Sequence, residues 1–260
     1  MVPTMSGLQP ETVSRILDDE EYIRQRIAPR PGDPLHLHFS DLLICLSQNA
    51  ATDEAIDLLD FGSGGSPYRS LFPNARYRRA DVRGTPGVDF EIQSDGRTNA
   101  PSGGFDLVLS TQVLEHVPDA ARYLRNCYDL IRPGGKLVLT THGMFEDHGC
   151  PNDFRRWTAD GLAMDIASAG FEVQVARKLT TEGRALAFLL RTKLQSLAAH
   201  EKDWYGLVFR ALHRMLGLMS RSFDTWCDRR LSGFRSVDAK EAGHTIYVAL
   251  LVTARKPSPL

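Results

Sequence analysis

Short runs rich in Leu, Val, Ile and Phe alternate with amphipathic stretches in the middle of the chain. The runs 56–61, 104–110 and 136–141 have the composition of buried parallel strands, and a further strand pattern covers 170–175. One helical pattern ends at Leu130, and another extends from Ala159 to Ala169 behind a suitable N-cap residue, Thr158. This alternation predicts an α/β fold with a mostly parallel sheet.

The first of these runs breaks into glycines directly after Asp60. The sequence GSGG at 62–65 removes side chains where the chain turns, so that a ligand can approach the backbone. Open α/β sheets bind ligands at the carboxyl ends of their strands. Pro67 suits the first position of a following helix, and it stands where a dinucleotide fingerprint needs its third glycine. The turn indicates a nucleotide pocket, and an ordinary tight turn is the alternative.

A second acidic strand end follows at the spacing that a ribose-binding carboxylate requires. Residues 75–82 form a short strand pattern that ends in Asp81 and Val82, about twenty residues after the glycines. Asp81 is therefore the candidate for binding both ribose hydroxyls. The strand pattern 104–110 ends near Ser110 and Gln112, and RPGG at 132–135 predicts a stop and a turn before the next strand.

In this order, the motifs resemble the class I S-adenosylmethionine-dependent methyltransferases, in the branch that includes the quinone-biosynthesis and type 11 enzymes. The likeness is carried by LDFGSGG (59–65), DV (81–82), FDLVLS (105–110), LEHV (114–117) and LIRPGGKL (130–137). The resemblance implies a Rossmann-like seven-stranded sheet, mostly parallel with one antiparallel edge strand. It also implies S-adenosyl-L-methionine as the cofactor. Ser63 and Ser66 depart from the residues that many relatives have in the glycine turn.

The resemblance assigns roles to the residues around the expected cofactor. Glycines 62 and 64 would lie under its methionine part, Asp81 would bind the ribose, and Ser110 with Gln112 would face the transferred methyl group and the substrate. The implied cofactor set is Asp60, Gly62, Gly64, Asp81, Val82, Asp95, Ser110 and Gln112. In the family, the pair at 115–116 mainly shapes the cofactor wall, so no catalytic role is assigned to it.

The loop after the fifth expected strand, HGMFEDHGCPNDFRRW at 142–157, concentrates ionisable and aromatic side chains at the expected mouth of the site. Histidine is the usual base for an alcohol acceptor. We predict His142 or His148 as the general base and Asp153 as the residue that orients it. Arg155, Arg156 and Trp157 are the candidates for substrate binding. The alternatives are a loop-anchoring ion pair of Asp153 with Arg156, a backbone contact of His142, and a core position for Trp157.

No metal site is predicted, because the spacing of His142, His148 and Cys150 matches no zinc pattern. The four cysteines are far apart, which fits reduced thiols in a cytosol. The net charge of −1 argues against bulk nucleic acid as a partner. No signal peptide and no membrane-spanning run is expected. These features predict a cytoplasmic protein, with peripheral contact at the inner membrane face left open.

The chain divides into an N-terminal helical cap (1–50), a methyltransferase core (51–178 and 245–256) and a helical insert (179–244). In the cap, His36, His38 and Phe39 either line the pocket or merely cover a sheet edge. Two helices are expected in the insert, at 184–198 and 203–231. The second is amphipathic, with an apolar face at Trp204, Val208, Ala211, Met215, Met219 and Phe223 and a polar face at Arg210, Arg214, Gly217, Arg221 and Asp224.

Residues 180–240 hold eleven Lys or Arg against six Asp or Glu, so the insert is basic. A basic amphipathic helix packs on its own domain, contacts a membrane or a lipid-linked substrate, or forms a homodimer. We predict a methyltransferase that acts on an oxygen of a small-molecule, saccharide or lipid-linked acceptor. The alternatives are an N- or C-methyltransferase, a methyltransferase-like module that only binds, and a nicotinamide-dependent oxidoreductase, which the missing third glycine disfavours.

Overall fold

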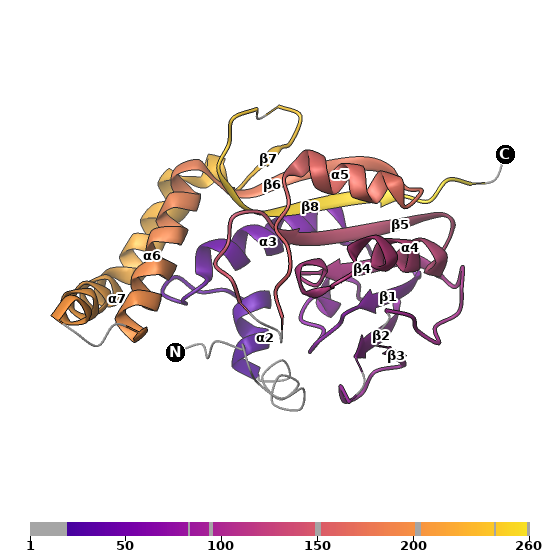
Figure 1. Ribbon diagram of the computed structural model, residues 1–260, viewed down its shortest axis with the longest axis horizontal. Coiled ribbons are helices and arrows are strands. Elements are labelled where there is room, and N and C mark those ends of the chain that lie inside the picture. The colour runs from indigo at the N-terminus through magenta and orange to yellow at the C-terminus, as the bar shows by residue number, and fades with distance from the viewer. Residues whose placement is uncertain are drawn as a thin grey trace.

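Eight strands of the protein form one sheet in the computed structural model, which describes residues 20–82, 84–93, 96–148, 152–200, 204–241 and 243–258. The order across the sheet is β3-β2-β1-β4-β5-β8-β6-β7 (Figure 1). The strands are β1 (Asp57–Phe61), β2 (Arg76–Val82), β3 (Phe90–Ile92), β4 (Phe105–Thr111), β5 (Ile131–His142), β6 (Glu172–Thr181), β7 (Ser236–Asp238) and β8 (Tyr247–Arg255).

The sheet is parallel from β3 to β5 and antiparallel from β5 to β7. The strands β3, β2, β1, β4 and β5 pair in parallel, whereas β8 is antiparallel to both β5 and β6, and β7 is antiparallel to β6. The predicted fold class is confirmed, with one strand more than the seven expected. The additional strand β7 lies in the segment 179–244, where only helices were expected.

Helices cover both faces of the sheet because neighbouring residues of each strand point to opposite sides. Their bounds are α2 (Glu20–Ile27), α3 (His36–Asn49), α4 (Ala120–Leu130), α5 (Ala159–Ser168), α6 (Glu182–His200) and α7 (Trp204–Arg230). Helices α4 and α5 enclose one core with Val108 and Leu139. Helix α3 encloses the other core with Leu109 and Val138. The predicted cap of α5 is confirmed, since Oγ1 of Thr158 accepts a hydrogen bond from the Gly161 amide at 3.1 Å.

The expected helix at Pro67 is wrong. Only a single 3₁₀ turn, Arg69–Leu71, separates β1 from β2. Pro73 explains the early stop, because the residue before a proline is disfavoured in the helical region. That residue, Phe72, has φ −134° and ψ 61°, and its side chain packs with Tyr68 and Tyr77 in the core around α3.

The sequence RPGG at 132–135 was expected to form a turn between a helix and the next strand. In the structure these residues already belong to β5, which begins at Ile131. The register between β4 and β5 jumps from Phe105 opposite Ile131 to Leu107 opposite Lys136. The residues in between bulge out of the sheet, and Gly134 has a positive φ of 80° there. Helix α4 does end at Leu130, as expected.

Helices α6 and α7 pack on each other at one end of the sheet (Figure 1). A small core of their own joins them to α3 and β8. A buried ionic cluster adds to it: Arg184 contacts Asp41 at 2.6 Å and Asp228 at 2.9 Å, and Arg235 contacts the same two carboxylates at 2.8 and 2.7 Å. These contacts connect α6 and α7 with α3.

Candidate active site

The carboxyl ends of β1 and β2 place Asp60, Gly62, Gly64 and Asp81 in one corner of the sheet. The carboxylate of Asp81 faces the glycine turn, where its Oδ2 accepts a hydrogen bond from the Gly64 amide at 2.5 Å. Its Oδ1 accepts one from the Val82 amide at 2.7 Å. Gly62 and Gly64 both have positive φ, 84° and 47°, a conformation that glycine adopts without strain.

Asp60 is a buried carboxyl group below this turn, with 2% of the residue exposed. Burial raises its pKa to about 7, and the neighbouring charge of Asp81 adds to the rise, while a 2.6 Å hydrogen bond from the Tyr77 hydroxyl opposes it. Its Oδ1 and the Nε of Arg79 are buried without a hydrogen-bond partner in the described part of the chain. Unsatisfied polar atoms of this kind point to a bound ligand.

These residues fit a cationic nucleoside such as S-adenosylmethionine. Asp81 offers negative charge, Asp60 offers it when ionised, and the turn offers backbone without side chains. The side chain of Val82 is 54% exposed beside them. Asp95 lies outside the described residues.

The end of β4 brings Ser110 and Gln112 next to this corner. The hydroxyl of Ser110 is fully buried and lies 2.8 Å from that of Tyr123, which donates to the Phe61 carbonyl at 2.9 Å. Ser110 thus links β4 to α4 and β1. Gln112 has a positive φ of 55°, and its backbone N–H donates to the Thr140 carbonyl at 3.0 Å. A strained residue other than glycine at a strand end is a common feature of functional sites.

A second set of polar side chains lies where β4 and β5 end. Nδ1 of His142 lies 2.5 Å from Oε1 of Glu115, and the Thr141 hydroxyl donates to the other oxygen of Glu115 at 2.8 Å. Glu115 is fully buried, and His142 is 3% exposed. Burial alone would raise the pKa of Glu115, but the charge and hydrogen bond of His142 outweigh it and lower that pKa to about 2. Glu115 is therefore the carboxylate that orients His142.

Three more histidines surround this pair. The ring of His148 lies 4.9 Å from that of His142. The ring of His38 lies 5.8 Å from that of His142, and the ring of His116 lies 5.0 Å from that of His148. Burial and then the nearby histidines lower the pKa of His148 to about 4. Burial above all lowers that of His38 to about 3. Both imidazoles are therefore neutral at physiological pH.

The other predicted loop residues make contacts within the protein. Asp153 accepts from the His148 amide at 2.9 Å and pairs with Arg156 at 2.5 Å, so the structure contains the loop-anchoring ion pair that was the alternative interpretation. Arg155 donates to the carbonyls of residues 117 and 118. Trp157 is 8% exposed and lies in a core cluster. The role of Asp153 in orienting a base and the roles of Arg155, Arg156 and Trp157 in substrate binding stay predictions.

Glu115, His142 and His148 place three potential metal ligands within 4.8 Å of one another. However, Oε1 of Glu115 and Nδ1 of His142 are only 2.5 Å apart. Two atoms bound to the same zinc ion at about 2.1 Å stand roughly 3 Å or more apart. The short separation favours a direct ion-pair contact between the carboxylate and the imidazole. Cys150, which entered the sequence argument on metals, lies outside the described residues.

Residues 35–216 match the family model described as a methyltransferase domain. The chain belongs to this family. The predicted resemblance to the class I S-adenosylmethionine-dependent methyltransferases is thereby confirmed at the level of family and fold. No helix within the described ranges is long and apolar enough to cross a membrane.

Curated relatives match a short part of this methyltransferase. The ubiquinone biosynthesis O-methyltransferase of Xanthomonas axonopodis pv. citri (strain 306) is 44% identical over 55 residues, which are 21% of this chain and 23% of that protein. The protein of the same name from Pseudomonas aeruginosa (strain LESB58) is 40% identical over 55 residues, 21% of this chain and 24% of its own. The chain spans about a quarter of the length of these relatives.

Solved structures match nearly the whole fold at low identity. The [4+2]-cyclase SpnF is 19% identical, with a TM-score of 0.53 and 98% of both chains covered. A putative methyltransferase from Bacillus halodurans C-125 is 16% identical, with a TM-score of 0.51 and coverage of 84% of this chain and 100% of that one. At these identities, the comparisons support the fold alone.

Sequence reasoning missed the catalytic potential of Glu115. The motif LEHV suggested only a wall of the cofactor site, and the partner of Glu115 lies on the following strand. Because β4 and β5 are neighbours in parallel, their carboxyl ends meet at one edge of the sheet. The pair could therefore have been found from the sequence only with the strand order known, as a polar residue after each of two adjacent strands.

Proposed function

We propose that this protein is an S-adenosylmethionine-dependent O-methyltransferase that acts on a hydroxyl group of a small-molecule, saccharide or lipid-linked acceptor. When bound, the cofactor supplies an electrophilic methyl group. The residues Asp60, Gly62, Gly64, Asp81 and Val82 would hold it at the ends of β1 and β2. The observation that carries the proposal is the buried pair of Glu115 and His142 at the ends of the next two strands.

The pair has the arrangement of a general base. Glu115 holds Nδ1 of His142, which leaves Nε2 as the atom that accepts the proton of an acceptor hydroxyl. The low pKa of Glu115, about 2, keeps its charge at neutral pH, and that charge stabilises the imidazolium that forms. His148 is the weaker candidate, because a pKa near 4 makes it a poor base at neutral pH.

Aromatic side chains around His142 would exclude water from the reaction. The ring of Phe145 lies 4.2 Å from that of His142, and Phe145 in turn lies 5.7 Å from Phe188 on α6. His38 contacts the same rings from α3. This wall would let an acceptor with an apolar part bind beside the base. The curated relatives that match over 55 residues are named ubiquinone biosynthesis O-methyltransferase, and this name supports methylation of oxygen.

The test combines cofactor binding with a methyl-transfer assay on a panel of hydroxylated, aminated and carbon-acid acceptors. We expect S-adenosylmethionine to bind the wild type and to bind an Asp81→Ala variant more weakly. Transfer should occur to a hydroxylated acceptor and fall in His142→Gln while cofactor affinity is retained. Transfer that is unaffected in His142→Gln would refute the assignment of the base, and selective transfer to amines or carbon acids would indicate an N- or C-methyltransferase.

A methyltransferase-like fold without methyl transfer is the second candidate. The observation behind this candidate is the similarity to a [4+2]-cyclase over 98% of this chain. A fold by itself does not determine the reaction. Cofactor binding without transfer to any acceptor of the panel would support this alternative.

A further inference from the structure

Helix α7 presents an apolar stripe to solvent. The stripe consists of Val208, Leu212, Met215, Met219 and Trp226, which are between 37% and 57% exposed. Their spacings of four, three, four and seven residues place all five on one side of a helix with 3.6 residues per turn. Several large apolar side chains in a row on a surface mark an interaction site.

The opposite side of α7 carries charges that are buried against the protein. Asp224 is fully buried, contacts Arg191 at 2.7 Å and accepts a hydrogen bond from the Gly32 amide at 2.7 Å. Asp228 contacts Arg184 at 2.9 Å and His36 at 2.8 Å. These ion pairs fix the rotation of the helix, so the outward orientation of the stripe is determined by the rest of the molecule.

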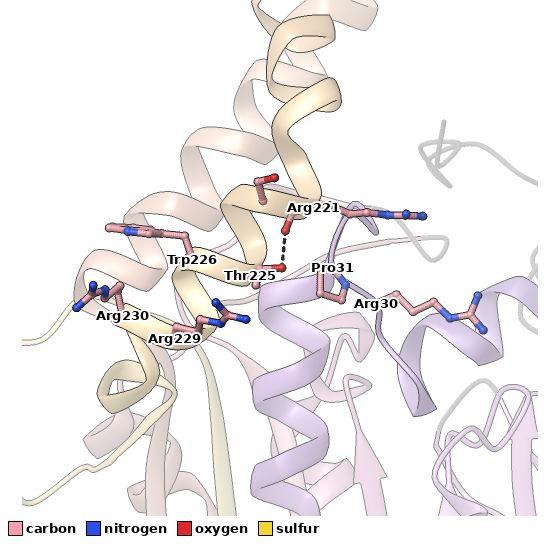
Figure 2. Close-up of a pocket in the computed structure, with 8 residues that line it drawn as sticks. Arg30, Pro31, Arg221, Thr225, Trp226, Arg229 and Arg230 are labelled. Atoms are coloured by element: carbon pink, nitrogen blue, oxygen red, sulfur yellow. Dashed lines mark hydrogen bonds between the residues drawn. The ribbon is translucent and has the colours of Figure 1, made fainter.

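Next to the stripe lies a groove of about 730 Å³, called here the arginine groove (Figure 2). Trp226 belongs to both the stripe and the groove. The other residues that line the groove include Arg30, Arg221, Arg229 and Arg230. All four arginines are exposed, and none of them forms an ion pair with another residue in the described ranges. Planar guanidinium groups bind phosphate in two-point contacts.

We propose that this face of α7 docks the protein on an anionic lipid surface. The stripe would enter the boundary between head groups and acyl chains, and Arg229 and Arg230, which line the groove beside Trp226, would bind lipid phosphates. Exposed apolar side chains flanked by exposed arginines are complementary to such a surface in both hydrophobicity and charge. The inference goes beyond the proposed methyl transfer and does not require it.

Charge distinguishes this occupant from a second copy of the chain. Residues 180–240 carry eleven Lys or Arg against six Asp or Glu. In a two-fold dimer, the same patch contacts itself. A dimer through this face would place two segments with an excess of basic residues against each other, and like charges across an interface oppose association.

The experiment measures co-sedimentation of the full-length protein with vesicles of phosphatidylcholine alone and with 30% phosphatidylglycerol. We expect binding only to the anionic vesicles, and weaker binding as salt rises. Met215→Glu/Met219→Glu should lower the bound fraction at least tenfold, as should Arg229→Glu/Arg230→Glu. Matched control variants on another face, Met164→Glu and Arg125→Glu on α5 and α4, should bind like the wild type.

Two further readouts keep the result decisive. Tryptophan emission should shift to the blue on addition of anionic vesicles, and the shift should be lost in Trp226→Phe. Equal or absent binding to both vesicle types by folded protein would overturn the proposal. It would also be overturned by sedimentation velocity showing a dimer that Met215→Glu/Met219→Glu dissociates. Thermal stabilisation by inorganic phosphate without vesicle binding would instead assign the groove to a small anion.

Discussion

Oε1 of Glu115 lies 2.5 Å from Nδ1 of His142 in the interior of the protein, where the 3₁₀ turn Leu114–His116 that follows β4 meets the end of β5. A buried carboxylate keeps its charge only if it is paired, and His142 provides that partner. The contact also fixes which ring nitrogen remains available for an acceptor. It is therefore the structural basis for the proposed proton transfer.

Replacing Glu115 with Gln should remove the charge while preserving the size of the side chain. We expect kcat for methyl transfer to fall by about 10²- to 10⁴-fold, because general-base catalysis contributes that much. The affinity for S-adenosylmethionine should stay within about twofold, since Glu115 is not among the residues proposed to bind the cofactor. Steady-state kinetics and calorimetry measure the two quantities. The exposed Glu172 provides the control variant Glu172→Gln, and equal kcat in both variants would contradict the role of the pair.

The burial of Asp60 predicts that cofactor affinity depends on pH. With a pKa of about 7, Asp60 is mostly protonated at pH 6 and mostly ionised at pH 8. The ionised form attracts the positive charge of S-adenosylmethionine, so affinity should increase across this range. Calorimetry at the two pH values measures the change. The dependence should vanish in Asp60→Asn and persist in the exposed control variant Asp53→Asn.

The raised pKa of the Asp60 carboxyl also predicts how the stability of the cofactor-free protein depends on pH. The pKa of Asp60 is about 7 in the folded protein and has its ordinary value of 3.8 in the unfolded chain, so folding takes up a proton between these two pH values. Its contribution to stability is present below about pH 4 and is lost as the pH rises to 7. Asp60→Asn should therefore raise the Tm more at pH 8 than at pH 5. An equal change at both pH values would show that the carboxyl is not perturbed in this way.

The local patterns of the sequence were sufficient to predict the strands β1, β2, β4 and β5 and the cap at Thr158. Each of these features is encoded by residues that are neighbours in the sequence. The same holds for the glycine turn and for the position of Asp81 at the end of its strand. The orientation of α7 could not be predicted in this way. Its helical pattern left packing on its own domain, membrane contact and a homodimer as alternatives. In the structure, Asp224 and Asp228 pair with arginines of α6, and those contacts orient the apolar stripe outward.

The catalytic pair illustrates the same limit. His142 and His148 were the candidate bases because of their loop, and Asp153 was expected to orient the one that acts. The structure places Asp153 against His148 and Arg156, whereas Glu115 lies against His142. Only the order of strands in the sheet brings Glu115 to His142, and no local pattern encodes that order.

The glycine turn gives a prediction for Gly62. Its φ is 84°, and an added Cβ would lie 2.6 Å from Cγ2 of Val113. Gly62→Ala should lower the free energy of unfolding by about 1–3 kcal/mol, from backbone strain and overpacking together. Val113→Ala in the same chain should recover only the packing part. Urea denaturation of the single and double variants measures this, and fully additive losses would show that the two side chains do not meet.

Arg184 tests how strongly the insert is held to the rest of the protein. It is fully buried and contacts Asp41 and Asp228. Arg184→Met keeps much of the volume but leaves two carboxylates with fewer partners, and removal of one member of a buried ionic cluster costs about 3–5 kcal/mol. Urea denaturation should show a loss of that size, whereas Arg229→Met, at an exposed position, should change the free energy of unfolding by less than about 0.5 kcal/mol. A loss below about 1 kcal/mol in Arg184→Met would mean that the apolar core between α6, α7 and β8 holds the insert without the ionic cluster.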